Sequence, residues 1–134
     1  MNKILITGGA GFIGSRIALK LLSKGYQVRV LDNLSPQIHG TNPKLSSPLY
    51  SSIINKVEFI HGDVTNNIDL ENAIENQDAV IHMAAETGTG QSMYQIKKYC
   101  DINIGGTAIL MDTLANRKHS IKKVIIASSR AIYG

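Results

Sequence analysis

Cysteine and long apolar runs, which mark two specialised classes of protein, are scarce in this sequence. Cys100 is the only cysteine among 134 residues, which excludes an internal disulfide framework and suits a reducing compartment. No run of about 18 or more apolar residues occurs, and Lys3, Arg16 and Lys20 interrupt the apolar N-terminal region, which argues against a membrane span and a signal peptide. We therefore expect a cytoplasmic protein without a membrane partner.

Charged residues are also few. They make up 18% of the chain against 43% for hydrophobic residues, values that exclude a disordered or fibrous protein. The net charge is +4 and the isoelectric point is near 9.3, but the excess positive charge is scattered. Its one cluster, Arg117, Lys118, Lys122 and Lys123, is interpreted as a solvated loop before a strand, so no nucleic-acid partner is expected.

Stretches typical of strands and helices alternate along a chain that has the length of one domain. The hydrophobic pattern predicts five strands, at residues 3–7, 27–31, 57–61, 79–83 and 123–127. It predicts helices at residues 12–24, 69–75 and 93–116, and a loop at residues 33–55, which holds all three prolines. The alternation predicts an α/β fold, a doubly wound parallel sheet with helices on both faces and right-handed crossovers.

The first predicted helix carries an apolar stripe. Its apolar side chains recur at helical spacing and should face the sheet: Ile13, Ile17, Ala18, Leu21 and Leu22. Gly25 follows and should end the helix.

The segment TGGAGFIG, residues 7–14, places four glycines between the first strand and the first helix. Glycine permits a tight turn, close approach of backbone to a ligand, and close packing of helix on strand. Free amides and the dipole at the start of the helix then form a site for a pyrophosphate. Gly9, Gly11 and Gly14 fit G-x-G-x-x-G, while Gly8, Gly11 and Gly14 fit G-x-x-G-x-x-G. The alternative is a tight glycine turn without a ligand, followed by an ordinary surface aspartate at Asp32.

Asp32 ends the second predicted strand, close to the spacing of about 20 residues at which an acidic side chain meets the adenosine ribose of a dinucleotide. A carboxylate accepts hydrogen bonds from both ribose hydroxyls but repels a 2′-phosphate, and Asn33 and Leu34 offer no compensating cation. The sequence therefore predicts a dinucleotide site that prefers NAD to NADP.

Several motifs together resemble one family. They are TGGAGFIG at residues 7–14, DN at 32–33, GDV at 62–64, VIHMAA at 80–85, NIGGT at 103–107 and SSRAIYG at 128–134. In this order they resemble the extended short-chain dehydrogenase/reductases, the NAD-dependent nucleotide-sugar epimerases and dehydratases, over the whole chain. LDNLSPQIHG and AAETGTGQSMYQI, residues 31–40 and 84–96, most resemble the deoxythymidine-diphosphate-rhamnose 4-epimerases. The resemblance implies an NAD(P)-binding Rossmann fold.

The resemblance also assigns cofactor-binding residues. They are Gly8, Gly11, Phe12, Ile13, Gly14, Asp32, Asn33, Asp63, Val64, Met83, Ala84, Ala85 and Asn103. Asp63 would take the adenine amino group with Val64 packing the ring, although an aspartate capping the following turn is the alternative. Residues 83–85 would line the nicotinamide ribose, where small side chains let the cofactor lie against backbone.

Asn103 lies on the helical stripe of Gly106, Leu110 and Leu114, so its amide should point toward the sheet and find partners there. In the resembling family this position helps organise the cofactor pocket, and a structural asparagine that ties helix to strand is the alternative. The two roles can coexist.

Two residues are expected on the substrate side. Ser129 matches the family's catalytic serine or threonine, which hydrogen-bonds the sugar hydroxyl or carbonyl, and Thr87 resembles a further substrate contact. His82 is interpreted as a core histidine with a satisfied ring. Tyr133 is interpreted as the packing tyrosine of a YG pair rather than the catalytic one. No metal site is expected.

The family's acid/base tyrosine, with a lysine four positions later, is expected beyond Gly134, as is the C-terminal substrate domain, so residues 1–134 are interpreted as an incomplete NAD-binding domain. Two hypotheses follow: the N-terminal piece of an enzyme acting on a nucleotide-diphosphate sugar, or a complete NAD-binding module without catalysis, such as a sensor or a truncated gene product. Either should be inactive alone. Exposed sheet edge and apolar surface predict a homo-oligomer.

Overall fold

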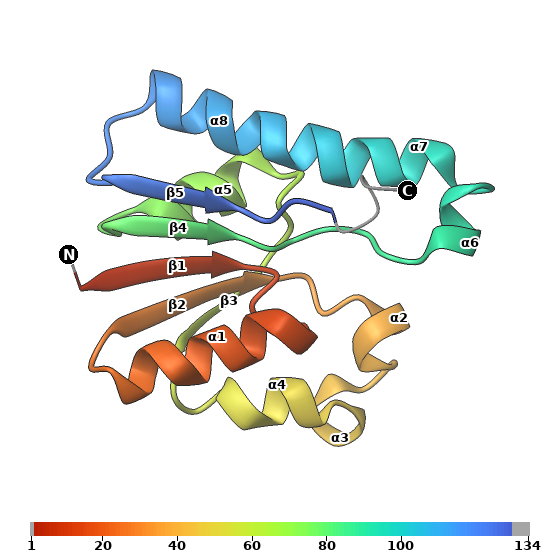
Figure 1. The fold of residues 1–134 in the computed structure, drawn as a ribbon, viewed down its shortest axis with the longest axis horizontal. Coiled ribbons are helices and arrows are strands. Elements are labelled where there is room, and N and C mark those ends of the chain that lie inside the picture. The colour runs from red at the N-terminus through yellow and green to blue at the C-terminus, as the bar shows by residue number, and fades with distance from the viewer. Residues whose placement is uncertain (1, 130–134) are drawn as a thin grey trace.

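Five parallel strands form one sheet in the computed structural model of the protein, which describes residues 2–129 (Figure 1). The strand order is β3-β2-β1-β4-β5, with bounds β1 (Lys3–Thr7), β2 (Gln27–Asp32), β3 (Glu58–His61), β4 (Ala79–His82) and β5 (Lys123–Ile126). Each strand ends within one residue of its predicted bounds. The predicted α/β fold with a doubly wound parallel sheet is confirmed.

Helices cover both faces of the sheet. Figure 1 shows α1 (Phe12–Ser23) and α4 (Pro48–Ile53) on one side, and α5 (Asn67–Ile74) and α8 (Gly106–Asn116) on the other. Side chains alternate along β1, so Ile4 and Ile6 join the core under α1 and α4 while Leu5 joins the core under α5 and α8. A fully buried side chain of this size stabilises the fold by about 1.5–3 kcal/mol.

The strand order reverses beside β1. The chain crosses from β1 to its neighbour β2 through α1, then moves outward to β3, and returns through α5 to β4 on the other side of β1. Parallel sheets of this kind bind ligands in the crevice at the carboxyl ends of the strands where such a reversal occurs. The ends of β1, β2 and β4 are therefore the place to look for a site.

The prediction of a loop at residues 33–55 is wrong, because three short helices occupy much of that segment. They are α2 (Pro36–His39), α3 (Pro43–Ser46) and α4 (Pro48–Ile53). A proline stands at the start of each helix, where its missing amide hydrogen has no intrahelical partner to lose. The prolines begin helices here instead of interrupting them.

The helix predicted at residues 93–116 begins later and is not uniform. A separate short helix, α6 (Thr89–Ser92), ends before residue 93, and the long helix starts as α7 (Ile96–Tyr99). It continues through the π-helical segment η1 (Cys100–Gly105) into α8. Such π segments are rare and often lie at functional sites.

The stripe predicted for the first helix is wrong at one position. Ile13 is 57% exposed, because it lies in the first turn, where the helix passes the end of the sheet. Ala18 is fully buried, and the other predicted stripe residues, Ile17, Leu21 and Leu22, pack against the same core. Gly25 follows the helix with a φ of +83°, as expected for a glycine that ends a helix.

The helix predicted at residues 69–75 is α5, which starts two residues earlier because the Asn66 side chain accepts hydrogen bonds from the amides of Ile68 and Asp69. Within residues 2–129, no helix combines the length and the apolar character needed to cross a membrane.

Candidate functional site

A cavity of about 290 Å³ opens at the carboxyl ends of β1, β2 and β4. The predicted site residues that line it are Gly8, Gly11, Phe12, Ile13, Gly14, Asp32, Asn33, Asp63, Val64, Met83, Ala84, Ala85 and Thr87. Of the predicted residues, Asn103 and Ser129 are outside this lining. The fold thus brings together residues that are widely separated in the sequence.

The glycine turn between β1 and α1 lies directly against the end of β4. Gly8 has a φ of +67°, and a Cβ atom there would lie 2.7 Å from both the Cα and the nitrogen of Ala84. Its own amide donates to the carbonyl of Leu31 at 2.8 Å. A side chain at Gly8 would therefore push the β1 turn away from β4 and change the floor of the cavity.

The N-terminal end of α1 faces this cavity. The Ser15 amide makes the first intrahelical bond, to the Gly11 carbonyl at 2.9 Å, so the three amides before it have no intrahelical acceptor. Those amides belong to Phe12, Ile13 and Gly14, which line the cavity. The first turn contains no acidic residue, so the positive end of the helix dipole is available to an anion.

Asp32 ends β2 beside this turn and is 8% exposed. One carboxylate oxygen accepts from the Ala10 amide at 2.9 Å and the other from the Leu34 amide at 2.9 Å. Nε2 of the buried His39 lies 3.8 Å from the carboxylate. A carboxylate has about four acceptor positions, so Asp32 is held by backbone on one side and can accept further hydrogen bonds on the other.

Asp63 follows β3, the strand next to β2, and lines the same cavity. It accepts from the Asn33 side chain at 2.9 Å, and from the Thr65 amide at 2.8 Å and hydroxyl at 2.7 Å. Burial raises the pKa of this carboxyl, but the bonds donated by Thr65 and Asn33 outweigh burial and hold the pKa below its usual value. Asp63 therefore caps the following turn, as the structural alternative requires, and it also lines the cavity.

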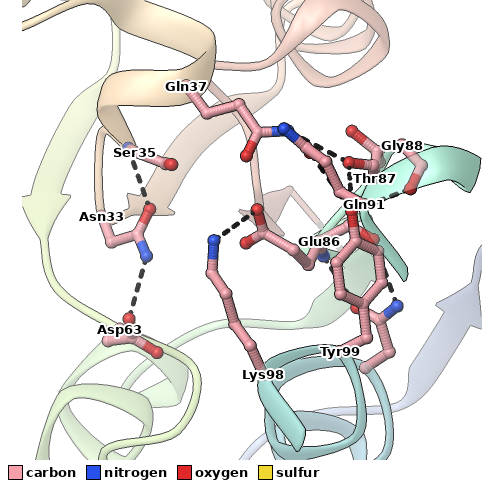
Figure 2. Close-up of polar contacts among 11 residues, drawn as sticks. Asn33, Ser35, Gln37, Asp63, Glu86, Thr87, Gly88, Gln91, Lys98 and Tyr99 are labelled. Atoms are coloured by element: carbon pink, nitrogen blue, oxygen red, sulfur yellow. Dashed lines mark hydrogen bonds and ion pairs between the residues drawn. The ribbon is translucent and has the colours of Figure 1, made fainter. Parts of the chain in front are cut away.

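A second bridge crosses from α2 to the segment after β4, as Figure 2 shows. The side-chain nitrogen of Gln37 donates to the Thr87 carbonyl at 3.1 Å and to the Gln91 side-chain oxygen at 2.6 Å. The hydroxyl of Tyr99 lies 2.7 Å from the Thr87 carbonyl and 2.9 Å from that of Gly88. The segments that follow β2 and β4 are thus connected to each other.

Asn103 binds both backbone groups of Glu86. Its side-chain oxygen accepts from the Glu86 amide at 2.7 Å and its nitrogen donates to the Glu86 carbonyl at 3.2 Å. The nearly buried Glu86 carboxylate lines the cavity and pairs with Lys98 at 2.8 Å (Figure 2). Asn103 therefore ties η1 to the segment after β4, as the structural alternative requires, and acts on the cavity wall through Glu86.

His82 is a buried core residue, as predicted. It is 4% exposed, and its two ring nitrogens contact the hydroxyls of Thr7 at 2.7 Å and Thr107 at 3.2 Å. Burial lowers the pKa of this ring, so the neutral form is favoured.

The substrate-side predictions fall in different places. Thr87 lines the cavity, whereas Ser129 follows β5 and is exposed outside the lining residues. Tyr133 lies outside the described residues. Tyr94 and Lys98 have the spacing of a Tyr-x-x-x-Lys motif, but Tyr94 is 86% exposed and lies outside the cavity lining.

Within residues 2–129 no group of three or more His, Cys, Asp or Glu side chains could hold a metal ion.

Sequence reasoning missed several residues that line the cavity. They are Leu31, Ser35, Ile38, His39, Leu49, Gly62, Glu86 and Ile102. Four of these lie in the segment predicted as a loop, where the prolines could have been recognised as helix starts. Gly62 belongs to the GDV motif, which pointed to Asp63 and Val64 but not to this glycine. Leu31, Glu86 and Ile102 carried no local signal, because the topology of the sheet brings them to the cavity.

The residues present fit a dinucleotide. The amides at the start of α1, which have no intrahelical acceptor, suit a diphosphate, and the fixed carboxylate of Asp32, one strand away, suits the hydroxyls of a ribose. Both line the same cavity.

Known proteins support this assignment. Residues 4–134 match the NAD dependent epimerase/dehydratase family. The chain is 37% identical to a bifunctional UDP-glucose 4-epimerase and UDP-xylose 4-epimerase of Pisum sativum, over 99% of this chain and 38% of that protein. It is also 37% identical to a dTDP-L-rhamnose 4-epimerase of Burkholderia thailandensis, over 99% of this chain and 36% of that protein.

Solved structures show the same fold. UDP-glucose 4-epimerase from Brucella ovis, in complex with NAD, superimposes with a TM-score of 0.80 at 36% identity, over 100% of this chain and 38% of that one. The enzyme from Bifidobacterium longum, in complex with NAD+ and UDP, gives a TM-score of 0.80 at 33% identity, over 99% and 38%. The protein is thus a member of the NAD dependent epimerase/dehydratase family, whose cofactor is NAD.

Proposed function

We propose that the chain is the NAD-binding part of a nucleotide-sugar epimerase or dehydratase that acts by transient hydride transfer. It spans 36–38% of the length of the two curated relatives described above. The substrate domain and the acid/base Tyr-x-x-x-Lys motif would belong to the remainder of such an enzyme. On this proposal residues 1–134 bind the cofactor and are inactive alone.

One observation carries the proposal. The N-terminal amides of α1 and the carboxylate of Asp32 line the same cavity, and the Ala10 amide joins the glycine turn to that carboxylate at 2.9 Å. This arrangement serves a diphosphate and a ribose simultaneously. The 2′-phosphate of NADP would meet the Asp32 carboxylate, so NAD is the preferred dinucleotide.

The other lining residues then take positions along the cofactor. Asp63 and Val64 serve the adenine, while Met83, Ala84 and Ala85 present backbone and small side chains to the nicotinamide ribose. Thr87 follows them toward the sugar substrate. Asn103 keeps this wall in place by binding both backbone groups of Glu86.

NAD supplies a hydride acceptor and donor at the sugar carbon when it is bound. On this proposal the hydroxyl of Ser129 hydrogen-bonds the sugar oxygen whose carbon is oxidised, and the tyrosine of the remaining part moves the proton. The sugar is a nucleotide-diphosphate sugar, as for the relatives named above. Ser129 is exposed after β5, and on this proposal the remaining part would cover it.

Calorimetric titration of the chain with NAD and with NADP tests the proposal. We expect one saturable NAD site and binding of NADP at least about tenfold weaker, since tenfold corresponds to about 1.4 kcal/mol. At 100 times the dissociation constant, NAD should stabilise the fold by about 2.7 kcal/mol and raise the melting temperature. The absence of saturable NAD binding would refute the proposal.

A further inference from the structure

His82 lies behind the cavity and not in it. It ends β4, pairs in register with Thr7 of β1, and is 4% exposed. Its ring is outside the cavity lining, and the proposed chemistry assigns it no task. Both of its nitrogens nevertheless contact threonine hydroxyls, one on β1 and one on α8.

The carbonyl of Asn103 determines which group donates in each of these hydrogen bonds. The Thr107 hydroxyl donates to the Asn103 carbonyl at 2.8 Å, because a carbonyl oxygen can only accept. The contact at 3.2 Å between Thr107 and Nε2 of His82 must therefore be donated by the ring. Nε2 carries the proton, and Nδ1 has a free lone pair.

The hydrogen bonds on the Nδ1 side of the ring are donated in the same order along the chain. Nδ1 accepts the hydroxyl hydrogen of Thr7 at 2.7 Å, and the Thr7 oxygen accepts from the Ala84 amide at 3.3 Å. A single chain of donated hydrogen bonds thus runs from Ala84 through Thr7, His82 and Thr107 to the carbonyl of Asn103. We call these five residues the His82 chain.

Both ends of the His82 chain reach the cavity wall. Ala84 lines the cavity directly and lies where a Cβ on Gly8 would meet its backbone at 2.7 Å. Asn103 at the other end binds the amide and the carbonyl of Glu86, which also lines the cavity. The His82 chain crosses the interior between β1, β4 and η1. It therefore couples the position of the π-helical segment η1 to the position of the backbone that lines the cavity.

We propose that His82 is a positioning residue of the cofactor site, acting through the His82 chain to fix the backbone of Ala84 and Glu86. The proposal rests on the proposed function, because it assumes that this wall of the cavity holds NAD. His82 itself does not touch the cofactor. A histidine that merely fills space would tolerate loss of the Thr107 hydroxyl, whereas a positioning histidine would not.

Substitutions of Thr107 separate these roles, since Thr107 is outside the cavity lining. Thr107→Val keeps the shape of the side chain and removes the hydroxyl, and Thr107→Ser keeps the hydroxyl. Thr113→Val is a matched control, because the Thr113 hydroxyl makes the same bond within α8, to Ile109 at 2.8 Å, and is not a member of the His82 chain. All variants would be compared with the unsubstituted chain in NAD titrations, thermal melting and nitrogen NMR of the histidine rings.

We expect NMR of the unsubstituted chain near pH 7 to show His82 neutral with its proton on Nε2. Thr107→Val should weaken NAD binding about fivefold and shift the proton toward Nδ1. Thr107→Ser should keep both the affinity and the tautomer, and Thr113→Val should leave NAD affinity within about twofold even where its melting temperature falls.

The outcomes are separable. If the unsubstituted chain binds NAD but His82 carries its proton on Nδ1, or if Thr107→Val binds NAD as tightly as the unsubstituted chain, the positioning role is wrong while NAD binding stands. Should Thr107→Val fail to fold, Thr107→Ala, which also removes the hydroxyl, takes its place: a loss of NAD affinity of about fivefold would support the positioning role, and unchanged affinity would refute it. Failure of the unsubstituted chain to bind NAD overturns the proposed function and the role of His82 at a cofactor site with it.

Discussion

The carboxylate of Asp32 accepts a hydrogen bond from the amide of Ala10 at 2.9 Å, so the end of β2 is tied to the glycine turn that follows β1. The second oxygen accepts from Leu34. Asp32 therefore ties the fold together and also places a carboxylate directly at the glycine turn. Substitution of this residue should affect stability and binding together.

Asp32→Asn should lower the free energy of unfolding by about 1–3 kcal/mol, because the new NH2 group cannot accept from a backbone amide. It should also weaken NAD binding and narrow the preference for NAD over NADP, since the negative charge is gone. Urea denaturation and calorimetric titration measure the two effects. Asp112→Asn is the control: Asp112 is exposed, and its carboxylate accepts from the side chain of Asn116 in the same helix, so the free energy of unfolding of this variant should stay within about 0.5 kcal/mol of that of the unsubstituted chain. An unchanged NAD to NADP ratio in Asp32→Asn would contradict the assignment.

Gly8→Ala should destabilise the chain by more than Gly25→Ala. Both glycines have positive φ, but a Cβ on Gly8 would lie 2.7 Å from the backbone of Ala84, whereas one on Gly25 meets nothing within 4 Å. Gly25→Ala should therefore cost about 1–2 kcal/mol for backbone conformation alone, and Gly8→Ala should cost more and reduce NAD binding. Gly90→Ala, in open space without positive φ, should be neutral. Equal losses at Gly8 and Gly25 would argue against the close contact between the glycine turn and the backbone of Ala84.

Gln37→Ala should speed the exchange of bound NAD. Gln37 connects the segments that follow β2 and β4 through Thr87 and Gln91, and both segments line the cavity. Removing the bridge should let them separate more easily, so the dissociation rate of NAD should rise about three- to tenfold, the equivalent of one hydrogen bond. Stopped-flow displacement by excess competing nucleotide measures this rate. Gln95→Ala, an exposed glutamine outside the cavity lining, should leave it unchanged.

Stability should fall as the pH drops below neutrality, partly through His82. Burial places the folded pKa of His82 below its ordinary value of 6.5. The unfolded chain therefore binds a proton first as the pH falls through 6.5, and the free energy of unfolding declines until the folded pKa is reached. Denaturation curves from pH 8 to pH 5 should show a shallower decline for His82→Asn than for the unsubstituted chain. Identical declines would show that His82 does not contribute.

Asp63 should contribute to the pH dependence of stability in a more acidic range than His82. Its folded pKa lies below the ordinary 3.8, so its contribution to stability is present above that value and is lost as the pH falls through the folded pKa. Asp63→Asn should remove this part of the acid transition, which the same denaturation series extended below pH 4 would reveal.

Self-association is a separate expectation. Large apolar side chains are exposed along α7, η1, α8 and β5, among them Ile96, Ile104, Met111, Ile125 and Ile126. Light scattering at tens of micromolar should show a species larger than a monomer, since exposed apolar surface of this extent favours association. A monomer at that concentration would contradict the expectation.

Much of the fold could be predicted from the sequence, because apolar runs rich in β-branched residues mark the buried strands β1 and β4 clearly. Shorter apolar runs mark the less buried edge strands β3 and β5. Both ends of every strand lie within one residue of the predicted bounds. The segment after β2 could not be assigned in the same way: Pro36, Pro43 and Pro48 indicate helix starts as much as loops, and only packing decides between them.

The cavity could be predicted only where a motif marked it. Gly8, Gly11, Gly14 and Asp32 have spacings that a diphosphate and a ribose impose. His39 and Glu86 have no such spacing. Helix α2 brings His39 beside Asp32, and Asn103 of η1 holds Glu86 at the cavity, so both placements depend on tertiary contacts that local sequence does not encode.

A nitrogen–proton NMR titration of the chain with NAD tests the central claim most directly. If the amides at the start of α1 hold the diphosphate while Asp32 holds the ribose, saturable shifts should be largest for the amides of residues 8–15 and 32–34, and NADP should produce them only at higher concentration. Saturable shifts confined to another surface, or none at millimolar NAD, would contradict it.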